Sequence, residues 1–217
     1  VFVRSVFLSL VIFVTNVAPL VGDPALPQSR GDCAEPAPGQ DLRHCDFNGA
    51  ILNGINLRGA RLDGVSFQNA RLGKCDLSGA SMREGDFKWA SLADCNLTAA
   101  DFTKADLFHT SFDGAVLDRA VLREANLFGA NLNGAKMRGA DFTRAYMKDV
   151  VMEESDMSRG LFNESFMLRA VLIDSNLTGA KLRMVVLKGA EMEDADLSES
   201  DLSGSLFNGA SLSGTRF

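Results

Sequence analysis

Large apolar residues recur at every fifth position along most of the chain. From Leu42 to Phe217, each fifth residue is Leu, Phe or Met, and no insertion or deletion breaks the register. The residue two places before it is small, most often Ala, and the residue directly before it is most often Asp or Asn, as in Asp46 and Asn56. Gly is frequent two places after it. This period fits neither an α-helix, which repeats about every 3.6 residues, nor a plain strand, which repeats every two.

A period of five does fit a short strand followed by a turn. Residues two apart on a strand point to the same side, so the small and the large residue both face inward. The next two residues must turn a corner, where Gly permits the positive φ of a type II turn. Recurring corners close the chain into a coil, and parallel backbone ladders join successive coils. The pattern therefore predicts an all-β fold, a β-solenoid with its small residues close to a narrow axis.

The repeat also resembles that of a known family. Stretches such as Ala130–Gly134 (ANLNG) and Ala140–Arg144 (ADFTR) match the A(D/N)LXX consensus of pentapeptide-repeat proteins, and the likeness covers residues 42–217. Known members form a right-handed quadrilateral β-helix, so the resemblance implies right-handed coils with four sides. The 36 large apolar positions, four to a coil, then give about nine coils. At a spacing of roughly 4.8 Å per coil, the rod is about 43 Å long.

The N-terminal part of the chain has a different composition. Residues 1–22 contain one early basic residue, Arg4, and an apolar run from Val6 to Val14. This layout predicts a secretory signal peptide, with an uncleaved membrane anchor as the alternative. Residues 23–41 hold four of the five prolines, which predicts an irregular linker and N-terminal cap ahead of the β-helix at residues 42–217.

The four cysteines fall into two pairs. Cys75 and Cys95 lie 20 residues apart and should occupy the small inward position of adjacent coils. Because their side chains would point in parallel directions, which is poor for bonding, we expect two buried free thiols. In an exported chain, a disulfide between Cys33 and Cys45 would tie the cap onto the open first coil. The run from Cys33 to Cys45 also looks like the start of other secreted pentapeptide-repeat proteins.

Charge and composition exclude several classes of function. The formal net charge is −6, so a general nucleic-acid binder is not expected. The two histidines, His44 and His109, lie too many coils apart to cooperate, and no phosphate-binding loop or nucleophile motif is present. His44 beside Cys45 hints at a metal, but the sequence offers no second pair of ligands. We therefore expect no enzyme activity, no catalytic residues, no cofactor and no metal.

One outward face changes from polar to apolar along the predicted rod. At 20-residue spacing, this face carries two columns of apolar residues, which we call the apolar strip: Tyr146, Phe166, Val186 and Leu206 in one column, and Phe108, Phe128 and Leu168 in the other. Continuous exposed apolar groups usually mark an interface, although scattered surface residues would give a similar pattern. Val151, Val171 and Ile173 would extend the strip around one corner.

Two smaller surface features favour ordinary surface roles. Trp89 and His109 share one outward column and could form an aromatic spot, but simple surface placement is favoured. Glu154, Asp174 and Asp194 would stack as an acidic column. Such a column suits a cation or a basic partner, and a solvated face is the favoured interpretation.

These features predict an exported, non-enzymatic scaffold in the periplasm or outside the cell. It would bind an unidentified protein through the apolar strip, and it would pair with itself through the C-terminal coil or the same strip. Membrane contact is expected only if the leader is not cleaved. The alternative, implied by the resemblance, is a DNA-mimicking protein that binds gyrase and confers quinolone resistance. The leader argues against it, as does a repeat region that carries a net charge of only −4, with 20 basic and 24 acidic residues.

Overall fold

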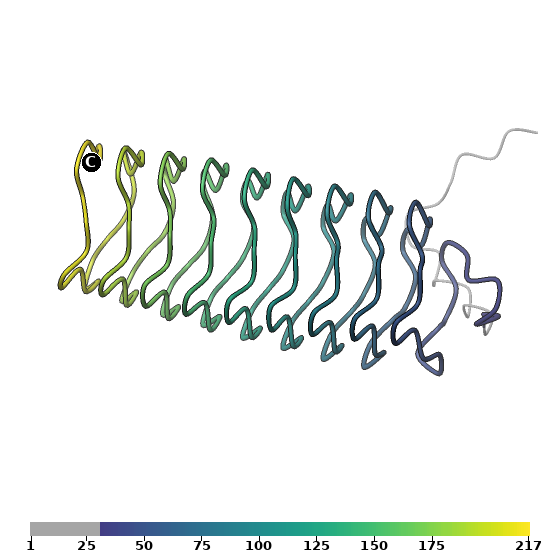
Figure 1. Cartoon of the computed structure of the whole chain (residues 1–217). Coiled ribbons are helices and arrows are strands. Elements are labelled where there is room, and N and C mark those ends of the chain that lie inside the picture. The colour runs from purple at the N-terminus through teal and green to yellow at the C-terminus, as the bar shows by residue number, and fades with distance from the viewer. Residues whose placement is uncertain (1–30) are drawn as a thin grey trace, which may run out of the picture.

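The computed structural model describes residues 31–217, and the chain there winds into a stack of coils that forms a rod (Figure 1). The predicted leader at residues 1–22, and residues 23–30 ahead of the cap, lie outside the described residues. Parallel bridges join residues 20 positions apart, beginning with Asp41 and Arg61. The bridged positions recur every five residues, at Asp46, Ile51 and Asn56, before the chain returns to Arg61. One coil therefore has four sides and takes 20 residues.

The strands of this rod are as short as strands can be. From residue 41 onward every bridge is isolated, with one bridge to each side of each coil, and the described residues contain no helix. Each side is this short because a turn occupies two of every five residues. In residues 31–217, accordingly, there is no helix of the length and apolarity that a membrane crossing requires.

The backbone N–H groups of one repeat show how the coils are held together. The N–H groups of Leu127 and Gly129 donate to carbonyls of the next coil, at 2.7 and 3.0 Å, and that of Asn131 donates to the previous coil at 3.0 Å. The N–H of Ala130 closes the turn by donating to the Leu127 carbonyl at 3.0 Å. Four of the five N–H groups in the repeat are thus bonded to backbone, and this satisfies groups that would be costly to bury unpaired.

The fifth N–H group explains the preference for Asp and Asn in the repeat. It belongs to the residue after the large apolar one, and it has no backbone acceptor. In many repeats the Asp or Asn two places earlier accepts its hydrogen bond, as Asn131 does from Asn133 at 3.0 Å and Asp101 from Thr103 at 2.9 Å. This local side-chain bond is the motif typical of Asp and Asn in turns.

The corners have the predicted turn geometry, with fewer glycines than the geometry would favour. Every fifth residue from Gly49 to Gly214 has a positive φ, and many of these residues carry a side chain, such as Lys104 with a φ of 61°. The residue before the positive-φ position has a negative φ, and the residue after it closes the turn by a hydrogen bond. This combination identifies type II turns.

The core is one continuous cluster, built from the inward side chains of all four sides. The large apolar residues from Leu57 to Leu197 are at most 1% exposed, and phenylalanines stack along part of the axis: Phe67 lies 4.9 Å from both Phe47 and Phe87 between ring centroids. At the last coil the inward residues are less covered, and Phe217 is 67% exposed.

Residues 31–40 form a cap against the first coil. The N–H of Gly39 donates to the Arg58 carbonyl at 2.9 Å, and the carbonyl of Gln40 accepts from Arg61 at 2.9 Å. A disulfide joins Cys33 to Cys45, with 5.5 Å between the Cα atoms. The cap and its disulfide leave Leu42 fully buried at the end of the core.

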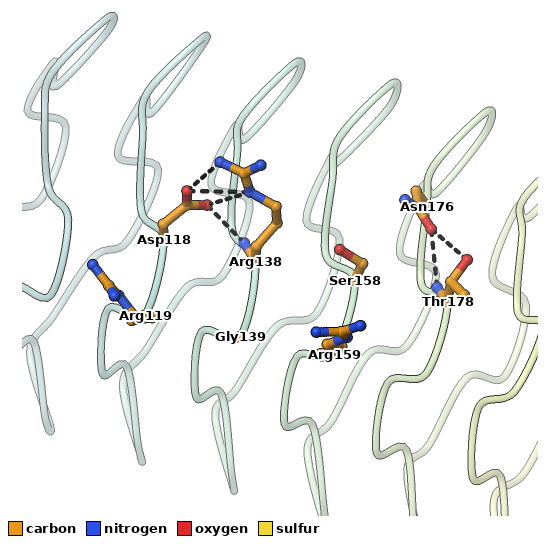
Figure 2. Close-up of a pocket in the computed structure, with 8 residues that line it drawn as sticks. All are labelled: Asp118, Arg119, Arg138, Gly139, Ser158, Arg159, Asn176 and Thr178. Atoms are coloured by element: carbon orange, nitrogen blue, oxygen red, sulfur yellow. Dashed lines mark hydrogen bonds and ion pairs between the residues drawn. The ribbon is translucent and has the colours of Figure 1, made fainter.

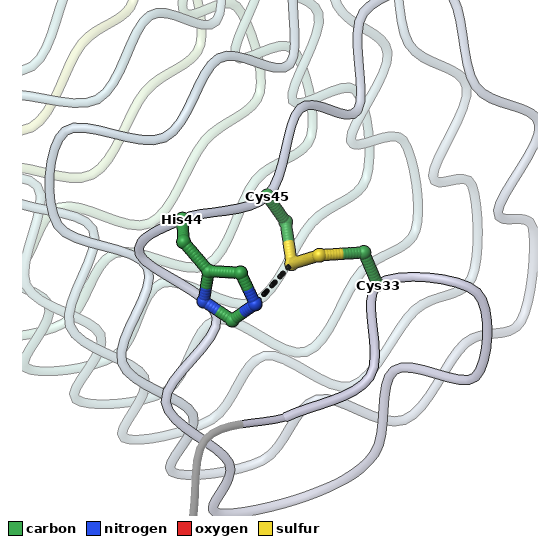
Figure 3. Close-up of side chains that lie close together, drawn as sticks. All are labelled: Cys33, His44 and Cys45. Atoms are coloured by element: carbon green, nitrogen blue, oxygen red, sulfur yellow. Dashed lines mark hydrogen bonds between the residues drawn. A yellow bond between two sulfur atoms is a disulfide. The ribbon is translucent and has the colours of Figure 1, made fainter.

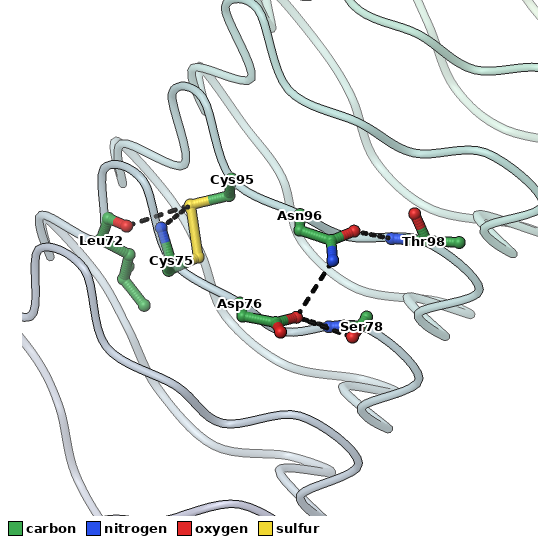
Figure 4. The surroundings of a disulfide bond; sticks show 7 residues. All are labelled: Leu72, Cys75, Asp76, Ser78, Cys95, Asn96 and Thr98. Atoms are coloured by element: carbon green, nitrogen blue, oxygen red, sulfur yellow. Dashed lines mark hydrogen bonds between the residues drawn. A yellow bond between two sulfur atoms is a disulfide. The ribbon is translucent and has the colours of Figure 1, made fainter.

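The expectation of free thiols at Cys75 and Cys95 is wrong. The structure joins them by a disulfide across adjacent coils (Figure 4). The stacked inward positions bring their Cα atoms to 4.6 Å, which is inside the range that disulfides span, so the parallel side-chain directions do not prevent the bond. Both residues are at most 2% exposed.

The two disulfides should differ in their reaction with a reductant. Cys33 is exposed, whereas Cys75 and Cys95 are buried. We expect a phosphine reductant to open the Cys33–Cys45 bond in the folded protein, because reduction requires access to a sulfur atom. Alkylation followed by peptide mass mapping should find Cys33 and Cys45 labelled first, and Cys75 and Cys95 labelled only after denaturation. Equal labelling in the folded state would contradict the burial of the second pair.

Candidate interaction surface

The rod brings the residues of the predicted apolar strip together on one side. Parallel bridges join Tyr146 to Phe166, Phe166 to Val186, and Val186 to Leu206, so this column is continuous over four coils. Tyr146 is 41% exposed and Leu206 44%, whereas Phe166 and Val186 are partly buried by their neighbours. The 20-residue spacing therefore places this column as the sequence predicted.

The aromatic members of the strip form a stacked ladder across both columns. Phe108 and Phe128 stack with 5.3 Å between ring centroids and an interplanar angle of 8°. Phe128 lies 6.3 Å from Tyr146 at 11°, and Tyr146 lies 5.4 Å from Phe166 at 3°. These near-parallel rings extend over four adjacent coils. Their spacing is set by the backbone ladder, so their arrangement requires little further ordering.

Trp89 and His109 extend this ladder, although the favoured prediction for these two residues was simple surface placement. The Trp89 ring stacks on His109 with 4.3 Å between centroids and 9° between planes, and it meets Phe108 edge-on at 5.5 Å. His109 also meets Phe108 and Phe128 edge-on, at 4.4 and 5.6 Å. We name the six stacked residues the aromatic ladder: Trp89, Phe108, His109, Phe128, Tyr146 and Phe166. Trp89 is its most exposed member, at 57%.

A glycine makes room for the imidazole in this ladder. A Cβ atom built on Gly129 would lie 2.4 Å from the His109 ring, so the ring occupies the space that a side chain there would need. Gly129 also has a φ of 62°, which glycine adopts without strain. The sequence signal that could have found this contact is the corner column itself, in which Trp89, His109 and Gly129 follow at 20-residue spacing.

Lysines border the aromatic ladder. The Nζ atom of Lys148 lies 5.4 Å from the centroid of the Phe128 ring, which is within the range of a cation–π contact. Lys88, at the other end, forms ion pairs with Asp86 at 3.2 Å and Asp106 at 3.0 Å. Leu168 is partly buried in its own column, where Lys148 precedes it. The border of the ladder is therefore polar and its centre aromatic, as in many protein interfaces.

A different side of the rod carries a shallow hollow of about 680 Å³ (Figure 2). Polar and basic residues line it: Asp118, Arg119, Arg138, Ser158, Arg159, Asn176 and Thr178, with Gly139. A guanidinium nitrogen of Arg138 lies 2.6 Å from a carboxylate oxygen of Asp118. This pairing holds the pKa of Asp118 below its usual range, against the effect of burial, which acts to raise it. The hollow is open and polar, which does not suit a small apolar ligand.

The acidic column does not form a ligand cluster. Glu154, Asp174 and Asp194 are exposed corner residues. Among residues 31–217, the group of three or more potential metal ligands whose atoms all lie within 4.8 Å of one another is Cys33, His44 and Cys45. That the column is a solvated face stays a prediction.

Carboxylates on a third side are paired with arginines. Asp141 is only 6% exposed, and a carboxylate oxygen lies 2.5 Å from Nε of Arg123. Burial acts to raise the pKa of Asp141, but hydrogen bonds from Thr143 and Arg123 outweigh it and hold that pKa below its usual range. Arg83 makes a looser contact with Asp101, at 3.8 Å.

We expect Arg123→Met to lower the free energy of unfolding by about 1 kcal/mol, because it leaves the buried Asp141 carboxylate without its charged partner. Arg83→Met is the matched control, since it removes the same side chain from a looser, more exposed pair. Its effect should stay within about 0.5 kcal/mol. Denaturant unfolding at neutral pH measures both, and equal losses would show that the burial of Asp141 is unimportant.

Comparison with known proteins agrees with this geometry. The family model described as pentapeptide repeats matches the chain in eight copies, with matched residues at 41–163 and 190–217. No curated protein sequence matches significantly.

Solved structures of repeat proteins are also similar. A trypsin-treated variant of QnrB1, a plasmid-mediated fluoroquinolone resistance protein, has 21% identity and a TM-score of 0.61, covering 74% of this chain and 88% of that chain. HetL, a pentapeptide repeat protein involved in heterocyst differentiation regulation in the cyanobacterium Nostoc, has 25% identity and a TM-score of 0.41, covering 79% and 86%. The family match and the likeness to QnrB1 identify the fold as a right-handed β-helix.

Proposed function

The chain belongs to the pentapeptide-repeat family, and from this premise we propose that it is an exported, non-enzymatic scaffold, a rod of about nine coils that binds a protein partner through its aromatic ladder. The observation that carries the proposal is the ladder itself. Six ring side chains lie in contact on the outside of the rod, and Trp89 and Tyr146 are 57% and 41% exposed. Exposed aromatic groups in a continuous patch usually mark an interface.

The energetics of such a surface favour protein binding. Trp and Tyr are over-represented among the residues that contribute most to binding between proteins. The rings of the ladder are already ordered by stacking on one another, so binding a partner would cost little side-chain entropy in these residues. Val186 and Leu206 continue the apolar surface for two more coils.

The two disulfides support export. Cys33–Cys45 and Cys75–Cys95 are both bonded in the structure, and structural disulfides persist in oxidising compartments and are rare in the cytosol. Intact-mass measurement of the protein expressed with its own leader tests this part of the proposal. A loss of roughly 2–3 kDa on maturation is expected for a cleaved leader, and full-length protein with four free thiols would contradict export.

A DNA-mimicking role is less well supported by the charges. A mimic of duplex DNA needs many unpaired negative charges along its sides. Here several carboxylates are neutralised by arginines, as in the pairs of Arg123 with Asp141 at 2.5 Å and Arg138 with Asp118 at 2.6 Å. A DNA-supercoiling assay with gyrase and micromolar protein should show no inhibition, and clear inhibition would favour this alternative.

Affinity capture with matched variants tests the interaction proposal. The purified protein, Phe128→Asp and Thr98→Asp are used as bait against an extract of the source organism. Thr98 is partly buried on a polar side of the rod and serves as the control. Phe128→Asp places a charge in the centre of the ladder and should weaken capture by about 30-fold or more, as expected for a central hot-spot residue.

The outcomes of this experiment are distinct. A partner recovered by wild type and Thr98→Asp, and lost with Phe128→Asp, supports the ladder as the interface. Equal recovery with all three baits overturns it. Size-exclusion chromatography of the same variants reports self-association, and a dimer that Phe128→Asp dissociates would identify a second copy of the chain as the partner.

A further inference from the structure

The cap brings together three side chains with sulfur and nitrogen ligand atoms. The ligand atoms of Cys33, His44 and Cys45 all lie within 4.8 Å of one another (Figure 3). Nε2 of His44 lies 3.8 Å from Sγ of Cys45, on the side toward the Cys33–Cys45 disulfide. We propose that, when this disulfide is reduced, the three side chains bind a divalent metal ion that prefers sulfur and nitrogen, such as Zn²⁺.

The distances suit a tetrahedral zinc site. Zn–S bonds of about 2.3 Å and Zn–N bonds of about 2.0–2.1 Å place two such ligand atoms about 3.6 Å apart when they share one tetrahedral ion. The His44 nitrogen and the Cys45 sulfur are already 3.8 Å apart. Once the S–S bond is broken, the two sulfur atoms can separate to about 3.8 Å, the spacing of two thiolates on one zinc ion. The Cα separation of 5.5 Å leaves room for this.

The positions of the ligands give the site one fixed and one adjustable part. Cys45 is 7% exposed and occupies the first small inward position of the rod, so the coil fixes its place. His44 and Cys33 are exposed, and Cys33 belongs to the irregular cap, which can adjust to the ion. Exposure on this side leaves a fourth position open to water, so the site has three protein ligands and one exchangeable one.

The chemistry balances in two steps. A reductant supplies two electrons to the S–S bond, which breaks to give the thiols of Cys33 and Cys45. A dithiol also supplies the two protons and becomes a disulfide, whereas with a phosphine one water molecule supplies the two protons and its oxygen, and the phosphine becomes the phosphine oxide. Metal binding then releases the two thiol protons, because cysteine binds zinc as the thiolate. The cap is therefore tied to the first coil by a covalent bond in the oxidised state and by an ion in the reduced state. This inference does not rest on the proposed interaction surface or on export.

Cobalt provides a direct probe of this site. The full-length protein is reduced with a phosphine, freed of the reductant without air, and titrated with Co²⁺ alone. A thiolate-to-cobalt charge-transfer band that saturates at one ion per chain is expected, and Zn²⁺ should displace it. Protein carried through the same steps without reductant should show no band.

Variants assign the ligands. His44→Ala should lower the affinity for Zn²⁺ by about 10-fold or more. Cys33→Ser should abolish the charge-transfer band that the thiolates of Cys33 and Cys45 give together. The double variant Cys75→Ala with Cys95→Ala is the control and should bind as wild type. Because His44 is exposed, its removal should leave the β-helix folded, which circular dichroism verifies. No band in the reduced protein, or an unchanged affinity in His44→Ala, would overturn the proposal.

Discussion

Replacing Phe67 with alanine is expected to lower the free energy of unfolding by about 3–5 kcal/mol. Phe67 is fully buried, and its ring stacks between Phe47 and Phe87 with 4.9 Å to each centroid. The backbone ladders on all four sides hold the coils at a fixed spacing, so the walls cannot collapse into the space that the ring leaves. Denaturant unfolding followed by circular dichroism measures the loss.

Phe128→Ala provides the matched control for this prediction. Phe128 also stacks on a phenylalanine one coil away, Phe108, at 5.3 Å, but it lies on the outside of the rod and is partly exposed. Its loss should lower the free energy of unfolding by only about 1 kcal/mol. If the two variants were equally destabilised, the buried core would not be the main source of stability.

Ser111→Pro should also be strongly destabilising and should lower the free energy of unfolding by about 3 kcal/mol or more. The N–H of Ser111 donates to the Ala90 carbonyl at 3.0 Å and is part of the ladder between coils. Proline has no N–H, and within a sheet it is tolerated only where no ladder bond is needed. The expected result is a large fall in the midpoint of thermal or denaturant unfolding.

Proline two residues later, at Asp113, should be tolerated. Asp113 is exposed and precedes Gly114, whose φ is 65°, and Ala115 closes the turn with a hydrogen bond of 2.9 Å to Phe112. Asp113 thus occupies the second position of a type II turn, where proline is favoured. Its carbonyl still accepts from Asp94 at 2.9 Å. We expect a change within about 1 kcal/mol of wild type, and a loss as large as that of Ser111→Pro would contradict this account of the ladder.

The main features of the fold could be predicted from the sequence, because one short period determines several of them at once. The unbroken spacing from Leu42 to Phe217 indicated which residues face inward and where the corners lie. The role of Asp and Asn before the large residue was missed, although the preference was visible. Periodicity reports which positions are alike, and only the structure reveals which backbone N–H lacks an acceptor, as at Asn133 beside Asn131.

The candidate surface could be predicted in part. Residues within one column, such as Tyr146 and Phe166, were placed together by the 20-residue offset alone. Trp89 and His109 belong to the neighbouring corner column, and the 20-residue offset does not relate them to Phe108 or Phe128. Contacts between neighbouring columns depend on the side-chain rotamers, and the repeat spacing does not predict these.

The cysteines show the same limit. The 20-residue spacing predicts the stacking of Cys75 on Cys95 but not the bond, because ideal parallel side-chain directions disfavour it, whereas the structure brings the Cα atoms to 4.6 Å and joins the sulfur atoms. The contact of the His44 ring with the Cys33–Cys45 disulfide was missed for a different reason. The Cys33–Cys45 disulfide itself was predicted and is confirmed, but no period relates the irregular cap to the first coil, so the position of the His44 ring beside the disulfide had to come from the structure.

The four-sided coil has a consequence for how such a chain can change in length. Deleting 20 residues removes one full circuit and leaves all later residues on their original sides, whereas deleting five moves everything downstream a quarter of the way around. A deletion of residues 61–80 should therefore shorten the rod and preserve the aromatic ladder. A deletion of residues 111–115 should cut the ladder, because Phe108 would then lie on a different side from Phe128. Gene duplications in multiples of 20 residues are thus the changes that lengthen the molecule without scrambling its surface.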